Sequence, residues 1–208
     1  MMGRGAPMGD GAIASGSAGA VQSGVLASGG SVLSMERPQC EVVSLQIWIP
    51  AGSRMEVERP GSGMAHFLEH MVFKGTARRT ALEINRLAER CGGFLNAYTF
   101  YDRTVYHIDL PVDHAVEGLD LLADFVWNPS LAADGFAPER DVILREIAMY
   151  QDDPDSFLYD SLLAAAFRED LLRHPVIGLE ERFRELTVED LRHFHSRHYR
   201  SPEMFLLM

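Results

Sequence analysis

The chain has 208 residues, of which 47% are hydrophobic, 24% charged and 9% aromatic, a composition typical of a soluble globular protein that buries one core. Its formal charge of −11, from 30 acidic and 19 basic residues, repels phosphate backbones and excludes nucleic acid as an expected partner. No uncharged apolar run reaches the roughly 18 residues of a membrane span, and two cysteines are too few for a disulfide framework, which favours a reducing compartment.

Residues 1–30 differ in composition from the rest of the chain. They hold nine of the 18 glycines, and their only charges are Arg4 and Asp10, so we expect a disordered tail. The stretch from Ala12 to Val25 is interrupted by Gly and Ser and lacks the apolar region of a secretory signal, and a transit peptide should contain more Arg. We therefore expect a cytoplasmic location, with mitochondrial or exported locations left open.

The next segments predict a strand and two helices. Val42–Ile49 is apolar and β-branched and ends at Pro50, which predicts a largely buried strand. A buried helix is expected over Met64–Phe73, ending before Gly75. A capping box at the start of Thr80–Cys91 predicts a second helix.

The rest of the domain is expected to contain a hairpin followed by helices. Phe94–Tyr101 and Thr104–Leu110 flank a tight turn with aromatic and β-branched residues, which predicts two antiparallel strands. Helical spacing of apolar residues then predicts four helices, at Asp113–Trp127, Pro138–Tyr150, Ser156–Arg168 and Thr187–Arg197. This order favours an α+β fold, with a mainly antiparallel sheet packed against several helices.

The last residues also favour a strand. Pro202 to Met208 is apolar and has no turn after it. We therefore expect residues 31–208 to form one domain that is truncated in its last strand. Such a strand would leave an unpaired sheet edge and an uncovered face.

The first predicted helix contains the sequence His66-Phe67-Leu68-Glu69-His70. Residues four apart lie on the same face of a helix, so His66 and His70 can bind one metal ion. Glu69 shares that face and can deprotonate a metal-bound water without being a ligand. This order, H-x-x-E-H, is that of inverzincin metallopeptidases. The alternative, a solvated helix face, is disfavoured by the apolar neighbours of these residues.

A catalytic zinc needs a third protein ligand and an open position, for which Glu146 is our candidate. Glu139 lies two turns earlier on the same face of that predicted helix and could orient a ligating His. On spacing alone, two Glu among Arg140 and Arg145 more often form an exposed, ion-paired surface.

Three segments together resemble the pitrilysin, insulinase and mitochondrial processing peptidase family of zinc metallopeptidases, and they correspond to its N-terminal catalytic half. They are Gly63–Thr76, which contains both histidines, the stretch Asn96–Thr99, and the helix from Glu139 to Ile147. The resemblance implies that His66, His70 and Glu146 bind zinc, that Glu69 is the general base, and that Glu139 supports the site. It also implies that a substrate strand pairs with Asn96 and Ala97.

The function implied is that of a zinc-dependent metalloendopeptidase with one Zn²⁺ per chain. It would hydrolyse extended peptides through a metal-bound water, and a second homologous half or subunit would complete the enzyme. We expect the chain alone to be weakly active or inactive, because that second half is absent from it. Two alternatives remain: a non-catalytic or partner-dependent subunit of a peptidase chamber, and a structural metal site, for which no fourth ligand is evident.

Overall fold

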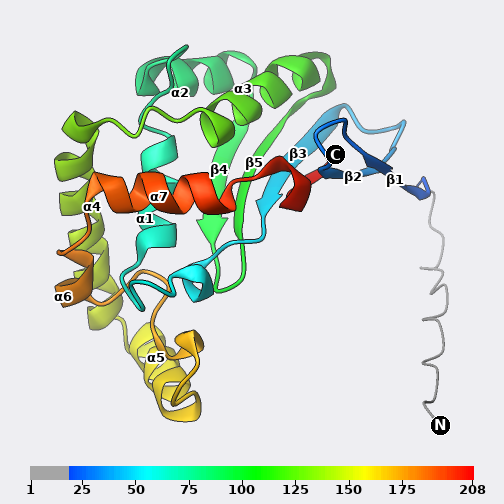
Figure 1. Ribbon diagram of the computed structural model, residues 1–208. Coiled ribbons are helices and arrows are strands. Elements are labelled where there is room, and N and C mark those ends of the chain that lie inside the picture. The colour runs from blue at the N-terminus through cyan, green and yellow to red at the C-terminus, as the bar shows by residue number, and fades with distance from the viewer. Residues whose placement is uncertain (1–18) are drawn as a thin grey trace, which may run out of the picture.

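The computed structural model describes residues 19–208 (Figure 1). The strands are β1 (Val21–Val25), β2 (Ser31–Met35), β3 (Val42–Ile49), β4 (Phe94–Thr99), β5 (Thr104–Pro111) and β6 (Phe205–Leu207). The α-helices are α1 (Met64–Val72), α2 (Ala81–Arg90), α3 (Ala115–Trp127), α4 (Ala133–Asp152), α5 (Pro154–Ala166), α6 (Glu180–Phe183) and α7 (Val188–His198). Short 3₁₀ turns lie at η1 (Ser53–Met55), η2 (Val112–His114), η3 (Leu171–Arg173) and η4 (Ser201–Glu203).

All six strands form one mixed sheet, in the order β1-β2-β6-β3-β5-β4. Four of its five neighbouring pairs are antiparallel, and only β2 and β6 run parallel. The expected α+β fold with a mainly antiparallel sheet is therefore confirmed. Strand β4 forms one edge of the sheet, since it pairs only with β5.

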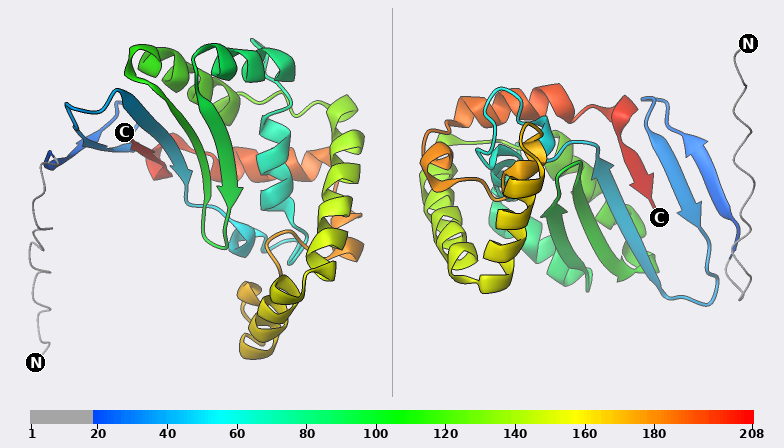
Figure 2. Two further views of the ribbon diagram at one scale, coloured as in Figure 1. Left: turned by 180° about the vertical axis from the view of Figure 1, so that it is seen from behind. Right: turned by 90° about the horizontal axis from the view of Figure 1, so that it is seen from below.

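The helices cover the sheet and place α1 at the centre of the molecule. Helices α1 and α3 pack against strands β3, β4 and β5, and α7 crosses α1 (Figures 1 and 2). Phe67, Leu68, Met71 and Val72 of α1 have no exposed surface, so the helix is fixed by burial on several sides. Within residues 19–208, no helix combines the length and the apolar character that a membrane span needs.

Most of the elements predicted from local signals are confirmed. The strand over Val42–Ile49 has the predicted bounds, and alternate residues Leu45, Ile47 and Ile49 are buried on one of its faces. Thr80 and Glu83 form the expected capping box of α2. Strands β4 and β5 pair as the predicted antiparallel hairpin.

Three expectations need correction. Residues 1–18 lie outside the described residues, but Val21–Val25, which we expected to be disordered, pairs with β2 as a sheet edge. Helix α4 begins at Ala133 rather than at Pro138, so this proline lies inside the helix. Strand β6 is not an unpaired edge, because β2 and β3 flank it on either side.

Candidate metal centre

Helix α1 presents its two histidines toward α4. The apolar residues of α1 are buried in the core, which leaves the face that carries His66 and His70 directed at the neighbouring helix. The side chains of His66 and His70 are 17% and 20% exposed, so both are shielded yet accessible to a small ligand. Glu69, on the same helix, is buried.

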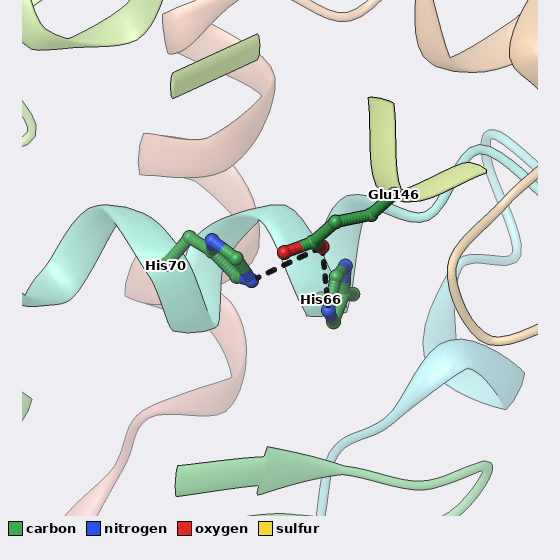
Figure 3. A group of neighbouring side chains, drawn as sticks. All are labelled: His66, His70 and Glu146. Atoms are coloured by element: carbon green, nitrogen blue, oxygen red, sulfur yellow. Dashed lines mark ion pairs between the residues drawn. The ribbon is translucent and has the colours of Figure 1, made fainter. Parts of the chain in front are cut away.

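Glu146 of α4 completes a cluster of three possible metal ligands (Figure 3). Its Oε2 lies 4.0 Å from His66 Nε2 and 3.7 Å from His70 Nε2. Zinc binds imidazole nitrogen and carboxylate oxygen at about 2.0–2.2 Å, so donors spaced by roughly 3.5–4 Å fit around one ion. The residue types and their spacing therefore suit a zinc site with three protein ligands.

Glu139 lies beside the second histidine. Its Oε1 is 2.8 Å from His70 Nδ1, and its other oxygen pairs with Lys74 Nζ. Because Nδ1 then donates to the carboxylate, the tautomer that results leaves Nε2 free to bind a metal. The structure thus brings Glu139 to the position expected of a residue that orients a ligand.

His66 has a different environment from His70. Burial and the neighbouring His70 lower its pKa from 6.5 to about 3. Its Nδ1 is buried and has no hydrogen-bond partner among the described residues. A neutral imidazole is the form that binds metal, but among the described residues no hydrogen bond at Nδ1 fixes the orientation of this ring.

Glu69 contacts the edge strand of the sheet. Its Oε2 accepts a hydrogen bond of 2.5 Å from Thr99 Oγ1 at the end of β4. Burial raises the pKa of Glu69 above its ordinary value, and the hydrogen bond from Thr99 opposes this rise. A carboxylate of raised pKa beside a metal site can both accept and return a proton.

Asn96 and Ala97 lie on the same edge strand. Asn96 Oδ1 accepts a hydrogen bond of 2.9 Å from the Ala97 backbone N–H. Phe100 N–H bonds to Arg103 O across the hairpin, and hydrogen-bonded pairs alternate along antiparallel strands. Ala97, three residues earlier, therefore directs its backbone N–H and C=O away from β5, toward the free edge.

A groove of about 500 Å³ runs along this edge and reaches the metal cluster. Its lining includes His66, Glu69 and Ala97, together with Tyr150, Tyr159 and Ile177. His66 of the cluster, the base candidate Glu69 and the free strand edge consequently line one cavity, which an extended chain could occupy.

Sequence reasoning missed two residues that support this site. Thr99 lies two residues beyond Ala97 in β4, so the two side chains share one face of the strand. This alternation is the sequence signal that could have identified Thr99 as a neighbour of the site. Glu56 is fully buried and hydrogen-bonds to the start of α1. Its sequence neighbours Glu58 and Arg59 suggest an ordinary charged loop, and no local signal distinguishes it from them.

Comparison with known proteins supports the same family as the sequence motifs. The family model described as insulinase, peptidase family M16, matches residues 31–179. An uncharacterized zinc protease of Mycobacterium leprae is 39% identical over 182 residues, which cover 88% of this chain and 40% of that protein. A probable β subunit of the mitochondrial processing peptidase of Arabidopsis thaliana is 37% identical over 80% of this chain and 31% of its own length.

A solved structure extends the comparison to three dimensions. The crystal structure of a protease from Helicobacter pylori matches with a TM-score of 0.86 and 30% sequence identity, covering 91% of this chain and 46% of the other. The chain thus spans less than half the length of these relatives.

Proposed function

Because this chain belongs to the insulinase (M16) family of peptidases, we propose that it is the zinc-binding catalytic part of a metalloendopeptidase. The observation that carries the proposal is the convergence of His66, His70 and Glu146 beside the buried carboxylate of Glu69. The H-x-x-E-H motif supplies His66, Glu69 and His70, and Glu146 is the carboxylate from a distant segment that serves as the third ligand.

Each residue of the site has a role that its contacts support. His66, His70 and Glu146 would hold one Zn²⁺, which when bound supplies Lewis-acid polarisation of a carbonyl and lowers the pKa of water. Glu69 would accept a proton from the attacking water and return it to the leaving amine. Glu139 would keep the His70 ring in the tautomer that offers Nε2.

The free edge of β4 supports peptides as substrates. An extended backbone can add to the edge as a further strand, pairing with the outward-facing C=O of Ala97 and, in exchange for its contact with Asn96 Oδ1, with the N–H of Ala97. Such pairing requires an unfolded segment in the substrate, so extended peptides are the proposed substrate class. A stable folded protein should be cleaved much more slowly than its denatured form.

A second homologous half or subunit is the proposed partner. The chain spans 40% of the Mycobacterium leprae relative, which leaves most of that protein's length unmatched. Helix α5 has no buried residue, and its side chains Phe157, Leu158 and Leu162 are 61–68% exposed. A partner covering α5 would also close the groove, because Tyr159 of α5 lines it.

Two other functions are weighed against this one. A non-catalytic chamber subunit would not need Glu69 buried beside a complete set of ligands. A structural zinc site needs a fourth protein ligand, whereas the cluster found among residues 19–208 contains three. Both observations favour catalysis.

Metal analysis of the purified chain, never exposed to chelator, tests the proposal. We expect about one zinc per chain in the wild type and a loss of zinc from His70→Ala, since two ligands hold the ion poorly. Asp113→Ala changes an exposed residue at η2 and serves as the control that keeps its zinc. A wild-type chain with far less than one zinc would contradict the assignment.

A further inference from the structure

We propose that Glu56 is a positioning residue for the zinc site, acting through hydrogen bonds to the first turn of α1. Glu56 lies ten residues before His66, in the loop after η1. The inference rests on the proposed function, because its consequence is measured as zinc affinity. It assigns a role to a residue that no motif of the sequence indicated.

The first turn of α1 cannot be capped by its own N-cap residue. The first N–H groups of a helix need acceptors, which an N-cap Ser, Thr, Asp or Asn usually provides. Here the N-cap is Gly63, with φ of +73° and no side chain to accept a hydrogen bond. A Cβ at this position would lie 2.2 Å from Ile177 O, so packing against that backbone excludes a capping side chain.

The carboxylate of Glu56 supplies the missing acceptors. Its Oε1 accepts a hydrogen bond from Ala65 N–H at 2.9 Å. Its Oε2 accepts three, from Gly63 N–H at 3.0 Å and from Ser62 N–H and Oγ–H at 3.1 Å each. In its ionised form, above a pKa that burial raises to about 7, this one side chain accepts hydrogen bonds from the backbone N–H groups of the N-cap residue and of the second helical residue, and its negative charge lies at the positive end of the helix dipole.

This carboxylate is completely shielded from solvent, with 0% exposed surface. A buried carboxylate without hydrogen bonds is strongly unfavourable, so the four donors are what makes this position tolerable for Glu. A Gln side chain has the same shape but only one acceptor oxygen. Its NH₂ group would face at least one N–H donor, which breaks that hydrogen bond and creates a donor–donor contact.

Glu56 is itself anchored to the hairpin that carries the substrate edge. Its backbone N–H bonds to Ser53 O at 3.2 Å. The N–H groups of Ser53 and Arg54 bond in turn to Phe100 O and Tyr101 O, at 3.2 and 2.8 Å. The loop thus links the β4–β5 turn to the start of α1, and it fixes the metal-binding helix relative to the strand that would bind substrate.

His66 is the ligand that depends on this link. It lies in the first turn of α1, directly after Ala65, whereas His70 lies one turn later and is held by Glu139. No hydrogen bond orients the His66 ring through Nδ1 among the described residues. The placement of His66 Nε2 is therefore determined by the backbone of the turn that Glu56 holds.

The test compares the zinc affinity of Glu56→Gln with that of Glu58→Gln, a matched control in the same loop whose carboxylate is exposed and pairs with Arg197. The Kd for Zn²⁺ is measured at pH 8, where Glu56 is ionised, by competition with a chromophoric chelator and under conditions in which each variant is folded. We expect Glu56→Gln to raise the Kd by about tenfold or more, the range for residues that support metal ligands, and Glu58→Gln to leave it within twofold. In the zinc-free chain, amide hydrogen exchange over residues 62–66 should accelerate in Glu56→Gln alone.

Each outcome decides between the two proposals. A wild type that fails to bind Zn²⁺ would overturn the proposed function, and the inference with it. A wild type that binds, with an unchanged Kd in Glu56→Gln, would overturn the inference alone, even if that variant melts at a lower temperature. If Glu56→Gln does not fold, Ser62→Ala decides, because it removes only the hydroxyl donor to Oε2: a weaker Zn²⁺ affinity supports the inference, and an unchanged one overturns it.

Discussion

Thr99 Oγ1 donates a hydrogen bond to Glu69 Oε2 at 2.5 Å, although 30 residues separate the two in sequence. The contact joins the edge strand β4 to helix α1, so the proposed general base is held by the same strand that offers its edge to substrate. One oxygen of the carboxylate is thereby oriented. The other remains available to a water molecule.

Thr99→Val should lower kcat with little change in KM. Val keeps the shape of Thr but removes the hydroxyl, and a hydrogen bond to a charged group contributes about 1.5–3 kcal/mol, which corresponds to a fall in kcat of roughly tenfold or more. Thr99→Ser keeps the donor and should retain most of the activity. Steady-state kinetics on an extended peptide measures both variants. A Val variant as active as the Ser variant would show that this contact does not orient the base.

Glu69→Gln should abolish turnover while keeping zinc and fold. The amide cannot accept the proton from water, and general acid–base catalysis contributes about 10²–10⁴-fold to rates, whereas the three proposed ligands are untouched. Zinc content, thermal unfolding and turnover are measured on the same preparation. Glu189→Gln, whose side chain is 72% exposed, serves as a control. Substantial turnover by Glu69→Gln would remove this residue from its role.

Glu56 should make the stability of the zinc-free chain fall as the pH rises. Burial raises its pKa from 4.5 to about 7, although its hydrogen bonds lower it. Between these values the folded chain holds a proton that the unfolded chain releases, so its stabilising contribution is complete below pH 4.5 and lost as the pH passes 7. The loss amounts to about 3 kcal/mol at most.

Denaturant unfolding of wild type and Glu56→Gln from pH 5 to 8, in the presence of chelator, measures this contribution. Other titrating groups are common to both chains and cancel in the comparison. The free energy of unfolding should decline more steeply with pH in the wild type. Parallel curves would mean that Glu56 ionises with an ordinary pKa in the folded chain.

Local signals in the sequence were enough to predict the elements that build the site. The capping box at Thr80, the alternation in Val42–Ile49 and the hairpin each depend on neighbours a few residues apart. Strand β1 could not be predicted in this way, because all five of its residues are exposed. A strand without a buried face shows no hydrophobic alternation, and only its pairing with β2 defines it.

Contacts between distant segments explain what else the sequence did not predict. The position of β6 inside the sheet depends on β2 and β3, which precede it by more than 150 residues. The same is true of the role of Glu56, which arises because Gly63 packs against the backbone of Ile177 and leaves no room for a capping side chain of its own. The spacing in H-x-x-E-H, by contrast, is set within one helix, and this is why His66 and His70 could be paired before any tertiary contact was known.

The outward-facing N–H of Ala97 leads to a last prediction, on substrate binding. Ala97→Pro removes this N–H but leaves the ladder between β4 and β5 intact, because the group points away from β5. Proline is tolerated on an edge strand where its missing N–H would face solvent. A substrate strand loses one main-chain hydrogen bond, which in the wild type replaces the contact of this N–H with Asn96 Oδ1, so KM should rise by up to about tenfold, while zinc binding and folding are retained. Ala97→Ser, which keeps the N–H, should behave like the wild type. An unchanged KM in Ala97→Pro, with Ala97→Ser equally active, would mean that substrates bind elsewhere in the groove than along this edge.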